Sequence, residues 1–480
     1  MIYQENRCSF FNSSFGLSTT LNTRDTNQQK KKNSAFHCGK TFRKNVKIPP
    51  VTFCFLFILL LTASPVSAAK LEMASSWNPV GSGARALAMG GAFIGVADDA
   101  TAASWNPAGL IQLERPEVSA VGAWFERTED GTYATNPEAN GSESVSEFNA
   151  NYLSFAYPFF LFNRNMVVSI NYQNLFDFNR QNNIFLDETV QSGMFMSERT
   201  IKEDHEGNIR ALGLAWAIRL IPSITLGLTL NVWDDILGDN GWETTYDEDA
   251  QTQLLNISPV NTTTILRESE YSFSGVNANI GFLWNITPQL TLGAVLKTPF
   301  TADVERETTT TETGTGTPGT TVETEKMEMD MPMSYGLGIA YRVSDELTLS
   351  ADLYRTEWDN FTQTSGTGVE TSPITDLSPE ASNIDPTHQI RIGAEYLMMK
   401  TDLIIPVRGG IFYDPAPAMD SPDEYYGFSI GSGLIFKRVV FDIAYQYRFG
   451  NDVGTSLHQI YDFSQDTVEH TIYTSAIVYF

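Results

Sequence analysis

Cysteine is nearly absent from this 480-residue sequence, and the few present lie at one end. All three, Cys8, Cys38 and Cys54, precede residue 70, so the rest of the chain can form no disulfide and no thiolate metal site. Basic residues are also scarce beyond residue 69, where 22 Lys and Arg face 55 Asp and Glu. Because nucleic-acid binding needs clustered cations, this balance excludes a nucleic-acid partner. The same part of the chain has no apolar run long enough for a membrane-spanning helix.

One apolar run, VTFCFLFILLL at 51–61, is typical of a secretory signal. Basic residues precede it, and the small residues after it predict cleavage after Ala68 or Ala69. The run is well short of the ~20 apolar residues of a membrane anchor, and no cysteine follows it, which argues against a lipoprotein. A true translation start near Val46 stays open, because the preceding polar stretch is longer than a signal needs. We therefore predict that residues 1–69 are an upstream extension plus a signal peptide that is removed.

The rest of the sequence repeats one pattern of alternating side chains. In 439–449, one face is apolar and aromatic (Val439, Phe441, Ile443) while the other carries small or polar residues. Two such faces are typical of a strand between lipid and a polar lumen. A soluble sandwich also alternates, but it rarely joins so many long strands by such unequal connections. The fourteen candidate strands are 116–126, 147–162, 165–178, 207–220, 223–233, 270–286, 289–300, 333–343, 346–358, 388–399, 403–414, 425–437, 438–450 and 469–480.

Connections between these candidates alternate in length. Tight turns are expected at 163–165, 222, 287–288, 344–345 and 437–438. Long acidic loops are expected at 127–146, 179–206, 234–269, 301–332, 359–387 and 451–468. In bacterial outer-membrane barrels the strand number is even, the short turns face the periplasm and the long loops face the exterior. The predicted fold class for 116–480 is therefore all-β, a 14-stranded antiparallel transmembrane β-barrel located in the outer membrane.

Few partners or cofactors are indicated by the remaining residues. The chain ends at Phe480 on an amphipathic strand, which resembles the signal read by the barrel assembly machinery. The acidic loops suit divalent cations that would bridge to lipopolysaccharide phosphates, although a solvated, repelling exterior explains them equally well. The four histidines beyond the signal lack metal-ligand spacing, so no metal and no cofactor is expected. We expect a monomer.

The stretch 78–116 does not alternate and is rich in Gly and Ala. Its GARALAMGGAF and ADDATAASWNPAGL segments resemble the N-terminal hatch of the FadL/TodX family of outer-membrane transporters for long-chain fatty acids and aromatic hydrocarbons. The segments 331–361 and 408–450 resemble later strands of that family. The resemblance implies a hatch of short helices and turns at 70–115 in the lumen of a barrel at 116–480.

What the resemblance implies for function is uptake of hydrophobic small molecules. An apolar solute needs an apolar track and a side exit into lipid. We expect capture at the outer loops, passage through an apolar pocket, and lateral exit beside a kinked strand once the hatch shifts. The residues assigned by this hypothesis are Asn106, Pro107, Ala108, Gly90 and Gly91 for hatch gating, Met89, Phe93 and Trp105 for the pocket, and Asn171, Gln173 and Asn174 for the kink.

Two alternative functions stay open from the sequence. Relatives similar to PorV share the hatch motif and serve protein secretion, which would make this chain a secretion scaffold or shuttle. The run GFSIG at 427–431 matches the G-x-S-x-G elbow of hydrolases, which would make it an outer-membrane lipase with Ser429 as nucleophile. That elbow needs a strand, a sharp turn and a helix, whereas this run lies inside an alternating strand. We therefore expect small residues on a lumen face and no enzyme.

Overall fold

A computed structural model describes residues 79, 81–190, 195–236, 238–254, 257–315, 318–457 and 462–480. All of them belong to one compact unit, Ser67–Phe480. The predicted signal peptide and upstream extension at 1–69 lie outside the described residues. No helix in the described part of the chain has the length and apolarity to cross a membrane.

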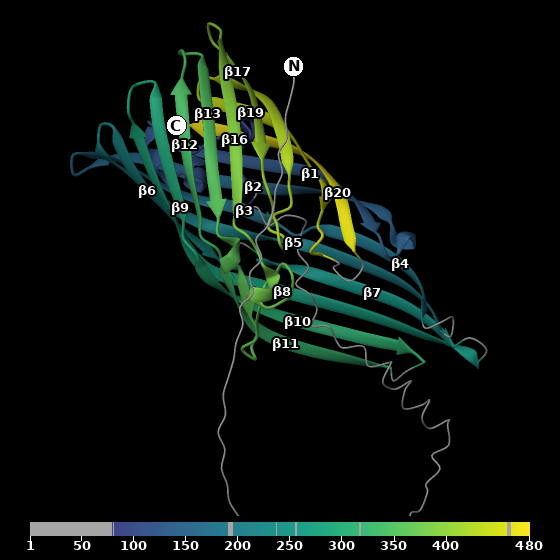
Figure 1. Cartoon of the computed structure of the whole chain (residues 1–480). Helices are drawn as coiled ribbons and strands as arrows, with labels where there is room; N and C mark the ends of the chain where they lie inside the picture. The colour runs from purple at the N-terminus through teal and green to yellow at the C-terminus, as the bar shows by residue number, and fades with distance from the viewer. Residues whose placement is uncertain are drawn as a thin grey trace, which may run out of the picture. The chain divides into compact units, whose positions relative to one another are not determined.

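The described chain forms one closed antiparallel sheet (Figure 1). Closure joins β1 to β20 along their lengths, from Glu117↔Tyr479 to Tyr133↔Phe463. Strands β4, β7, β10 and β11 continue β3, β6, β9 and β12, while β14 and β15 are short additions, so the ring has 14 strands as predicted. The bounds are β1 (Glu117–Tyr133), β2 (Gly141–Leu161), β3 (Arg164–Asp177), β4 (Arg180–Val190), β5 (Phe195–Ile221), β6 (Ile224–Trp233), β7 (Gly241–Leu254), β8 (Ile257–Asn285), β9 (Leu290–Lys297), β10 (Phe300–Gly314), β11 (Gly319–Met331), β12 (Ser334–Arg342), β13 (Leu347–Thr356), β14 (Thr362–Thr364), β15 (Glu370–Thr371), β16 (Thr387–Met399), β17 (Ile404–Tyr413), β18 (Tyr426–Phe436), β19 (Val439–Val453) and β20 (Phe463–Tyr479).

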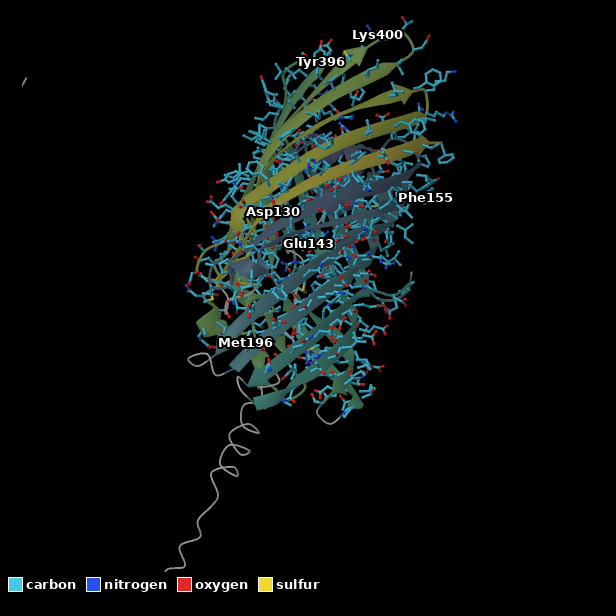
Figure 2. All side chains as sticks on the ribbon, turned by 90° about the vertical axis from the view of Figure 1, so that its right-hand side faces the viewer. Asp130, Glu143, Phe155, Met196, Tyr396 and Lys400 are labelled. Carbon is cyan, nitrogen blue, oxygen red and sulfur yellow. The ribbon has the colours of Figure 1, made fainter. Side chains whose placement is uncertain are left out.

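Alternation along each strand creates a lipid-facing outer surface. On β19, Phe441 and Ile443 are more than half exposed, whereas Asp442 and Ala444 between them are buried in the lumen. Exposed large apolar side chains recur in this way around the ring, which matches the apolar band of a transmembrane barrel. Tight turns join the strands at one end, and Figure 2 places Lys400, in one of them, at the opposite end from Met196.

For four of the six long connections, the prediction of a loop is wrong. The segments 127–146, 179–206, 234–269 and 301–332 mostly continue the strands as long paired hairpins, for example from Phe300↔Met331 to Glu312↔Gly319. Figure 1 shows the resulting wall of β7, β8, β10 and β11. Two of them, 234–269 and 301–332, are rich in Thr, which is β-branched and suits strands. The inner face of 234–269 and 301–332 contributes Trp242 and Met329 to a buried aromatic and methionine cluster.

The lumen holds the segment that precedes β1. It contains α2 (Ala84–Ala88), α3 (Ala102–Trp105) and the 3-10 helix η1 (Pro107–Gln112), almost all of whose residues are buried. We call residues 79 and 81–115 the hatch. The other short helices, η2 (Pro137–Ala139), η3 (Trp358–Asn360) and α4 (Pro379–Ser382), lie in the connections at the long-hairpin end.

Candidate functional site

Paired glycines on the inner wall allow the hatch backbone to approach it closely. Gly227 on β6 and Gly281 on β8 are register partners. A Cβ at Gly227 would lie 2.5 Å from the carbonyl oxygen of Pro107, and one at Gly281 would lie 2.7 Å from the amide nitrogen of Ala108. Any side chain at either position would therefore push the Asn106–Ala108 turn off the wall.

The same arrangement recurs at two other places in the ring. Gly293 and Gly338 are partners, and a Cβ at Gly293 would lie 2.5 Å from the carbonyl oxygen of Ile94. Gly393 and Gly410 are also partners, and a Cβ at Gly410 would lie 2.6 Å from the carbonyl oxygen of Met89. The middle of the hatch is therefore in direct backbone contact with the wall on both sides of the lumen.

Side-chain hydrogen bonds fix the Asn106 turn. The Asn106 amide donates to the carbonyls of Ile94 (2.9 Å) and of Phe282 on β8 (3.1 Å), and its oxygen accepts from the Ala108 amide (3.2 Å). Asn106, Pro107 and Ala108 thus lie where the hatch meets β6 and β8. Their predicted role in gating stays a prediction.

The Gly90–Gly91 turn is held from the opposite part of the wall. Both glycines have positive φ, 68° and 75°, which favours residues without a side chain. The Gly90 amide donates to the Ser429 hydroxyl (2.8 Å), which donates in turn to the Ala88 carbonyl (3.0 Å). Arg391 donates to the Gly90 carbonyl (3.2 Å). Ser429 is therefore a lumen-facing strand residue that binds hatch backbone, as expected for small residues on that face.

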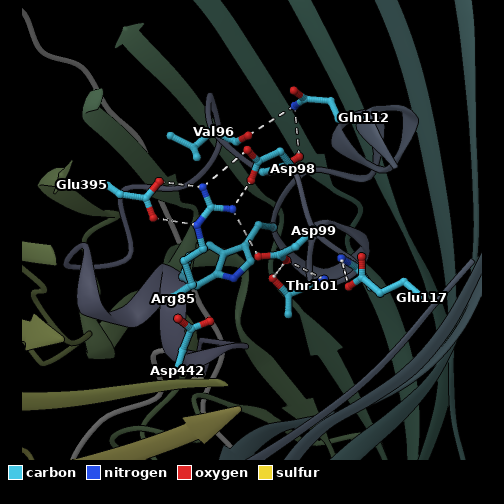
Figure 3. A network of polar contacts seen from close by, with 12 residues as sticks. Arg85, Val96, Asp98, Asp99, Thr101, Gln112, Glu117, Glu395 and Asp442 are labelled. Atoms are coloured by element: carbon cyan, nitrogen blue, oxygen red, sulfur yellow. Dashed lines mark hydrogen bonds and ion pairs between the residues drawn. The ribbon is translucent and has the colours of Figure 1, made fainter. Parts of the chain in front are cut away.

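A buried cluster of charges joins α2 to the wall (Figure 3). Arg85 donates two hydrogen bonds to Glu395 (3.0 and 2.9 Å) and contacts Asp98. Glu395 also accepts from Arg408 (2.6 Å), which binds Asp442 at 2.7 Å. Removing one member of such a buried network leaves an unpaired charge, which costs about 3–5 kcal/mol. The central hatch is therefore fixed to the wall.

An apolar pocket lies beside the hatch. Half of its sixteen lining residues are apolar, and the others are neutral amides, hydroxyl residues and one charged residue, Lys297 at the end of β9. Lys297 is half-buried, and no described residue forms a hydrogen bond or ion pair with its ammonium group. The sequence analysis missed Lys297; its signal was that it is the one charged residue in the candidate strand 289–300. The pocket is lined by Pro79, Gln173, Leu175, Phe176, Asn231, Trp233, Asn277, Asn279, Lys297, Thr298, Phe300, Met331, Pro332, Ser334, Thr356 and Trp358.

The three residues predicted to lie near the pocket do not line it. Met89, Phe93 and Trp105 are buried in the hatch core, where Phe93 packs edge-on against Trp105. The Phe93 amide donates to Asp352 on β13 (2.6 Å), which ties this core to the wall. Apolar hatch residues pack together here instead of facing a cavity, so their contribution to ligand binding stays a prediction.

A second cavity, of about 110 Å³, lies on the other side of Pro79. Its wall is polar and carries three arginines and three carboxylates, among them Arg391, Asp414 and Asp177. Both cavities touch Pro79, while Gln173 lines the apolar one and Asn174 lines the polar one. The first residues of the hatch therefore separate an apolar from a polar chamber.

A break in the wall borders the polar cavity. Strands β2 and β3 pair only as far as Tyr152↔Gln173. Beyond that point, β2 stays with β1 while β3 follows β5, so residues 141–151 and 174–187 face each other without backbone pairing. We call this break the seam. Side chains bridge it, including Asn149 to Asp177 (3.1 Å) and Asn183 to Glu143 (2.9 Å).

Both strands are irregular where the seam begins. The register of β3 against β5 shifts between Asn174 and Phe176, directly after the predicted kink residues Asn171, Gln173 and Asn174. The register of β2 against β1 shifts at Asn151. The Asn151 side chain donates to the Gly81 carbonyl (2.9 Å) and accepts from the Gly83 amide (3.3 Å). The start of the hatch is thus bonded to the margin of the seam.

In the part of the chain that the structure describes, no group of three His, Cys, Asp or Glu residues has the geometry to hold a metal ion.

Comparison with known proteins places this arrangement in a family. A family model of outer membrane protein transport proteins (OMPP1/FadL/TodX) matches residues 59–479. The structure of a Pseudomonas aeruginosa FadL homologue aligns with 84% of this chain and 100% of its own, at 13% identity and a TM-score of 0.56. The P. putida toluene transporter TodX aligns with 83% of this chain and 99% of its own, at 13% identity and a TM-score of 0.55. No curated protein sequence matches the chain. The family model covers most of the sequence, and the chain belongs to the OMPP1/FadL/TodX family of outer-membrane transporters of hydrophobic substrates.

Proposed function

We propose that this outer-membrane protein takes up hydrophobic small molecules that carry a carboxylate, with long-chain fatty acids as the first candidates. The observation that carries the proposal is the apolar pocket, in which Lys297 is the only charged residue among the described lining. An amphiphilic anion would place its chain against Trp233 and Phe300 and its carboxylate on the Lys297 ammonium.

Lys297 is what separates fatty acids from neutral aromatic hydrocarbons. A half-buried ammonium without a partner is costly, because burial removes hydration that nothing replaces. A carboxylate in the pocket would supply the missing charge, whereas toluene or an alkylbenzene would bury the ammonium further and leave it unpaired. The pocket therefore favours the anion.

For the exit route, we propose that the ligand moves past Pro79 and leaves the lumen sideways through the seam. The glycine contacts and the Arg85 cluster support a hatch whose body stays in place. Pro79 lines both chambers, and Gly81 and Gly83 are bonded to Asn151 at the seam margin. Hatch gating would then be a displacement of this first segment alone, which differs from a shift of the entire hatch.

We also infer that the protein is not an enzyme. The Ser429 hydroxyl is engaged with the Gly90 amide and the Ala88 carbonyl, and no histidine in the described part of the chain forms a hydrogen bond with it. A nucleophilic serine needs a base within hydrogen-bond reach. These contacts support a structural serine.

The pocket assignment is tested by a pair of lysine variants in the detergent-purified barrel. Lys297→Met keeps the apolar length of the side chain and removes the charge, and Lys326→Met, at an exposed lysine of β11, is the matched control. Oleate affinity should fall at least about tenfold in Lys297→Met, since one close charge pair is worth about 1.4 kcal/mol or more. Affinity for the neutral analogue oleyl alcohol should not fall. Equal oleate affinity in both variants would contradict the assignment.

Uptake in cells tests the function itself. Deleting the gene should reduce uptake of long-chain fatty acids, and wild-type protein should restore it. A secretion scaffold would instead co-purify with a partner protein and retain no lipid, which mass spectrometry of the purified barrel would show.

A further inference from the structure

The connection between β13 and β16 differs from the other long hairpins. Thr356 and Thr387 are register partners, so the chain leaves the wall and returns to it at one point. Between them, residues 357–386 form only η3, β14, β15 and α4 and do not extend the barrel wall. We call this segment the outer lid.

The lid is attached to the wall by little backbone pairing. Strand β14 pairs with β11 from Glu328↔Thr364 to Asp330↔Thr362, and β15 pairs only with β14. By contrast, β10 and β11 pair along most of their lengths. A further attachment joins Asn383 to Asp420, whose amide donates to the Asn383 carbonyl (3.2 Å). Single backbone contacts also join Glu357 to Met333 and Ile384 to Met419. The described lid is therefore attached to the wall at separate points and not along a long ladder.

The underside of the lid is apolar. Trp358 and Phe361 are 2% and 1% exposed and pack edge-on, with ring centroids 5.6 Å apart. Both belong to the buried cluster that includes Trp233 and Met329. Trp358 also lines the apolar pocket and donates its indole N–H to the Thr387 hydroxyl (3.0 Å). The lid therefore closes the pocket on the side of the long hairpins.

In this closed arrangement the pocket is too small for its ligand. Its volume is about 70 Å³, whereas an engineered cavity that holds one benzene measures about 150 Å³. A ligand with a longer chain can enter only if part of the wall moves. The Gly410 and Gly227 contacts hold the hatch body in place, and the flanking strands are continuously paired. Among the described wall segments that line the pocket, the lid is joined to its neighbours at isolated points and not along a continuous ladder.

We propose that the outer lid gates admission from the exterior to the apolar pocket: it swings about Thr356 and Thr387 and withdraws Trp358 and Phe361 from above the pocket. The Trp358–Thr387 hydrogen bond acts as its latch. This inference rests on the proposed function, since it names how the same pocket is opened.

A disulfide across the lid tests the proposal. Glu328 on β11 and Thr364 on β14 face each other, and facing residues of antiparallel strands have Cα atoms about 4.5–5.5 Å apart, within the range of a disulfide. The chain has no cysteine beyond Cys54, so the Glu328→Cys/Thr364→Cys pair gives one unambiguous bond. The control pair, Thr311→Cys/Thr320→Cys, joins β10 and β11 at facing residues away from the lid.

The readout is the association rate of oleate with the detergent-purified barrel, followed by tryptophan fluorescence. Oxidising the lid pair should slow association at least about tenfold, reduction should restore it, and oxidising the control pair should change nothing. Phe361→Ala, which removes an apolar anchor of the lid, should speed association. Equal association rates in the oxidised and reduced lid pair would overturn the proposal that the lid gates the pocket. Absence of oleate binding in the wild type and in every reduced variant would instead overturn the proposed function.

Discussion

Adding a methyl group at Gly410 should displace the hatch. The Gly410 Cβ would overlap the Met89–Gly90 backbone, with the Met89 carbonyl oxygen only 2.6 Å away. The contacting atoms are backbone atoms held by Ser429 and Arg391, so they cannot turn aside as a flexible side chain would. Overpacking of this kind costs about 1–3 kcal/mol. We expect Gly410→Ala to lose that much stability in urea unfolding of the barrel in lipid vesicles.

The neighbouring residue provides a matched control. Gly409 lies on the same strand, and a Cβ there would meet only the Ser429 carbonyl oxygen, at an ordinary 3.7 Å. Gly409→Ala should be neutral or stabilising by about 0.5–1 kcal/mol, because alanine loses less backbone freedom on folding than glycine. The Gly410→Ala variant should also admit a hydrophilic dye that the wild type excludes. Equal unfolding free energies for the two variants, within about 0.5 kcal/mol, would refute the idea that the hatch is fixed by close contact with the glycines.

Three further predictions concern other parts of the chain. Burial raises the pKa of Asp423, in the loop before β18, to about 6. The ionised form is thus disfavoured in the fold, and stability should rise by at most about 3 kcal/mol as the pH falls from about 6 to about 4, roughly half of it by pH 5. Asp423→Asn should remove this pH dependence in urea unfolding at about pH 7.5 and about pH 5. Asn151→Ala should release the first hatch segment and speed oleate dissociation several-fold. An unchanged dissociation rate would show that this contact does not control the exit of oleate. Purified wild type and Ser429→Ala should show the same background ester hydrolysis; a loss in the variant would revive the lipase reading.

The membrane-spanning part of the fold was predictable because one simple rule governs it. Lipid outside and a crowded lumen inside impose a two-residue alternation, as at Phe441 and Asp442 on β19. The number of such segments in the sequence correctly predicted a ring of 14 strands. The rule weakens outside the membrane. In β10 and β11 the outer face meets water, so Thr and Glu replace apolar residues and the strands resemble loops in sequence.

The site was less predictable, because its parts come together only in the folded ring. The hatch motif located Asn106 and the Gly90–Gly91 turn, but no local pattern links Lys297 to Trp358 on a different strand connection. The register shift of β3 after Asn174 lies beside the polar residues predicted to form the kink. Buried amides such as Gln173 can form side-chain hydrogen bonds there, next to the point where backbone pairing ends. Lumen residues can be predicted by face, whereas cavities depend on which strands become neighbours.

The attachment of the hatch to the last third of the barrel has a consequence for assembly. Gly90 binds Ser429, 339 positions later, and Arg85 binds Glu395, 310 positions later. The hatch therefore leaves the ribosome long before its binding partners exist, and contacts between such distant residues form slowly. Ser429 and Glu395 lie on strands β18 and β16, near the end of the sheet that pairs with β1 through β20. The wall that holds the hatch is therefore complete only when the two ends of the sheet are joined.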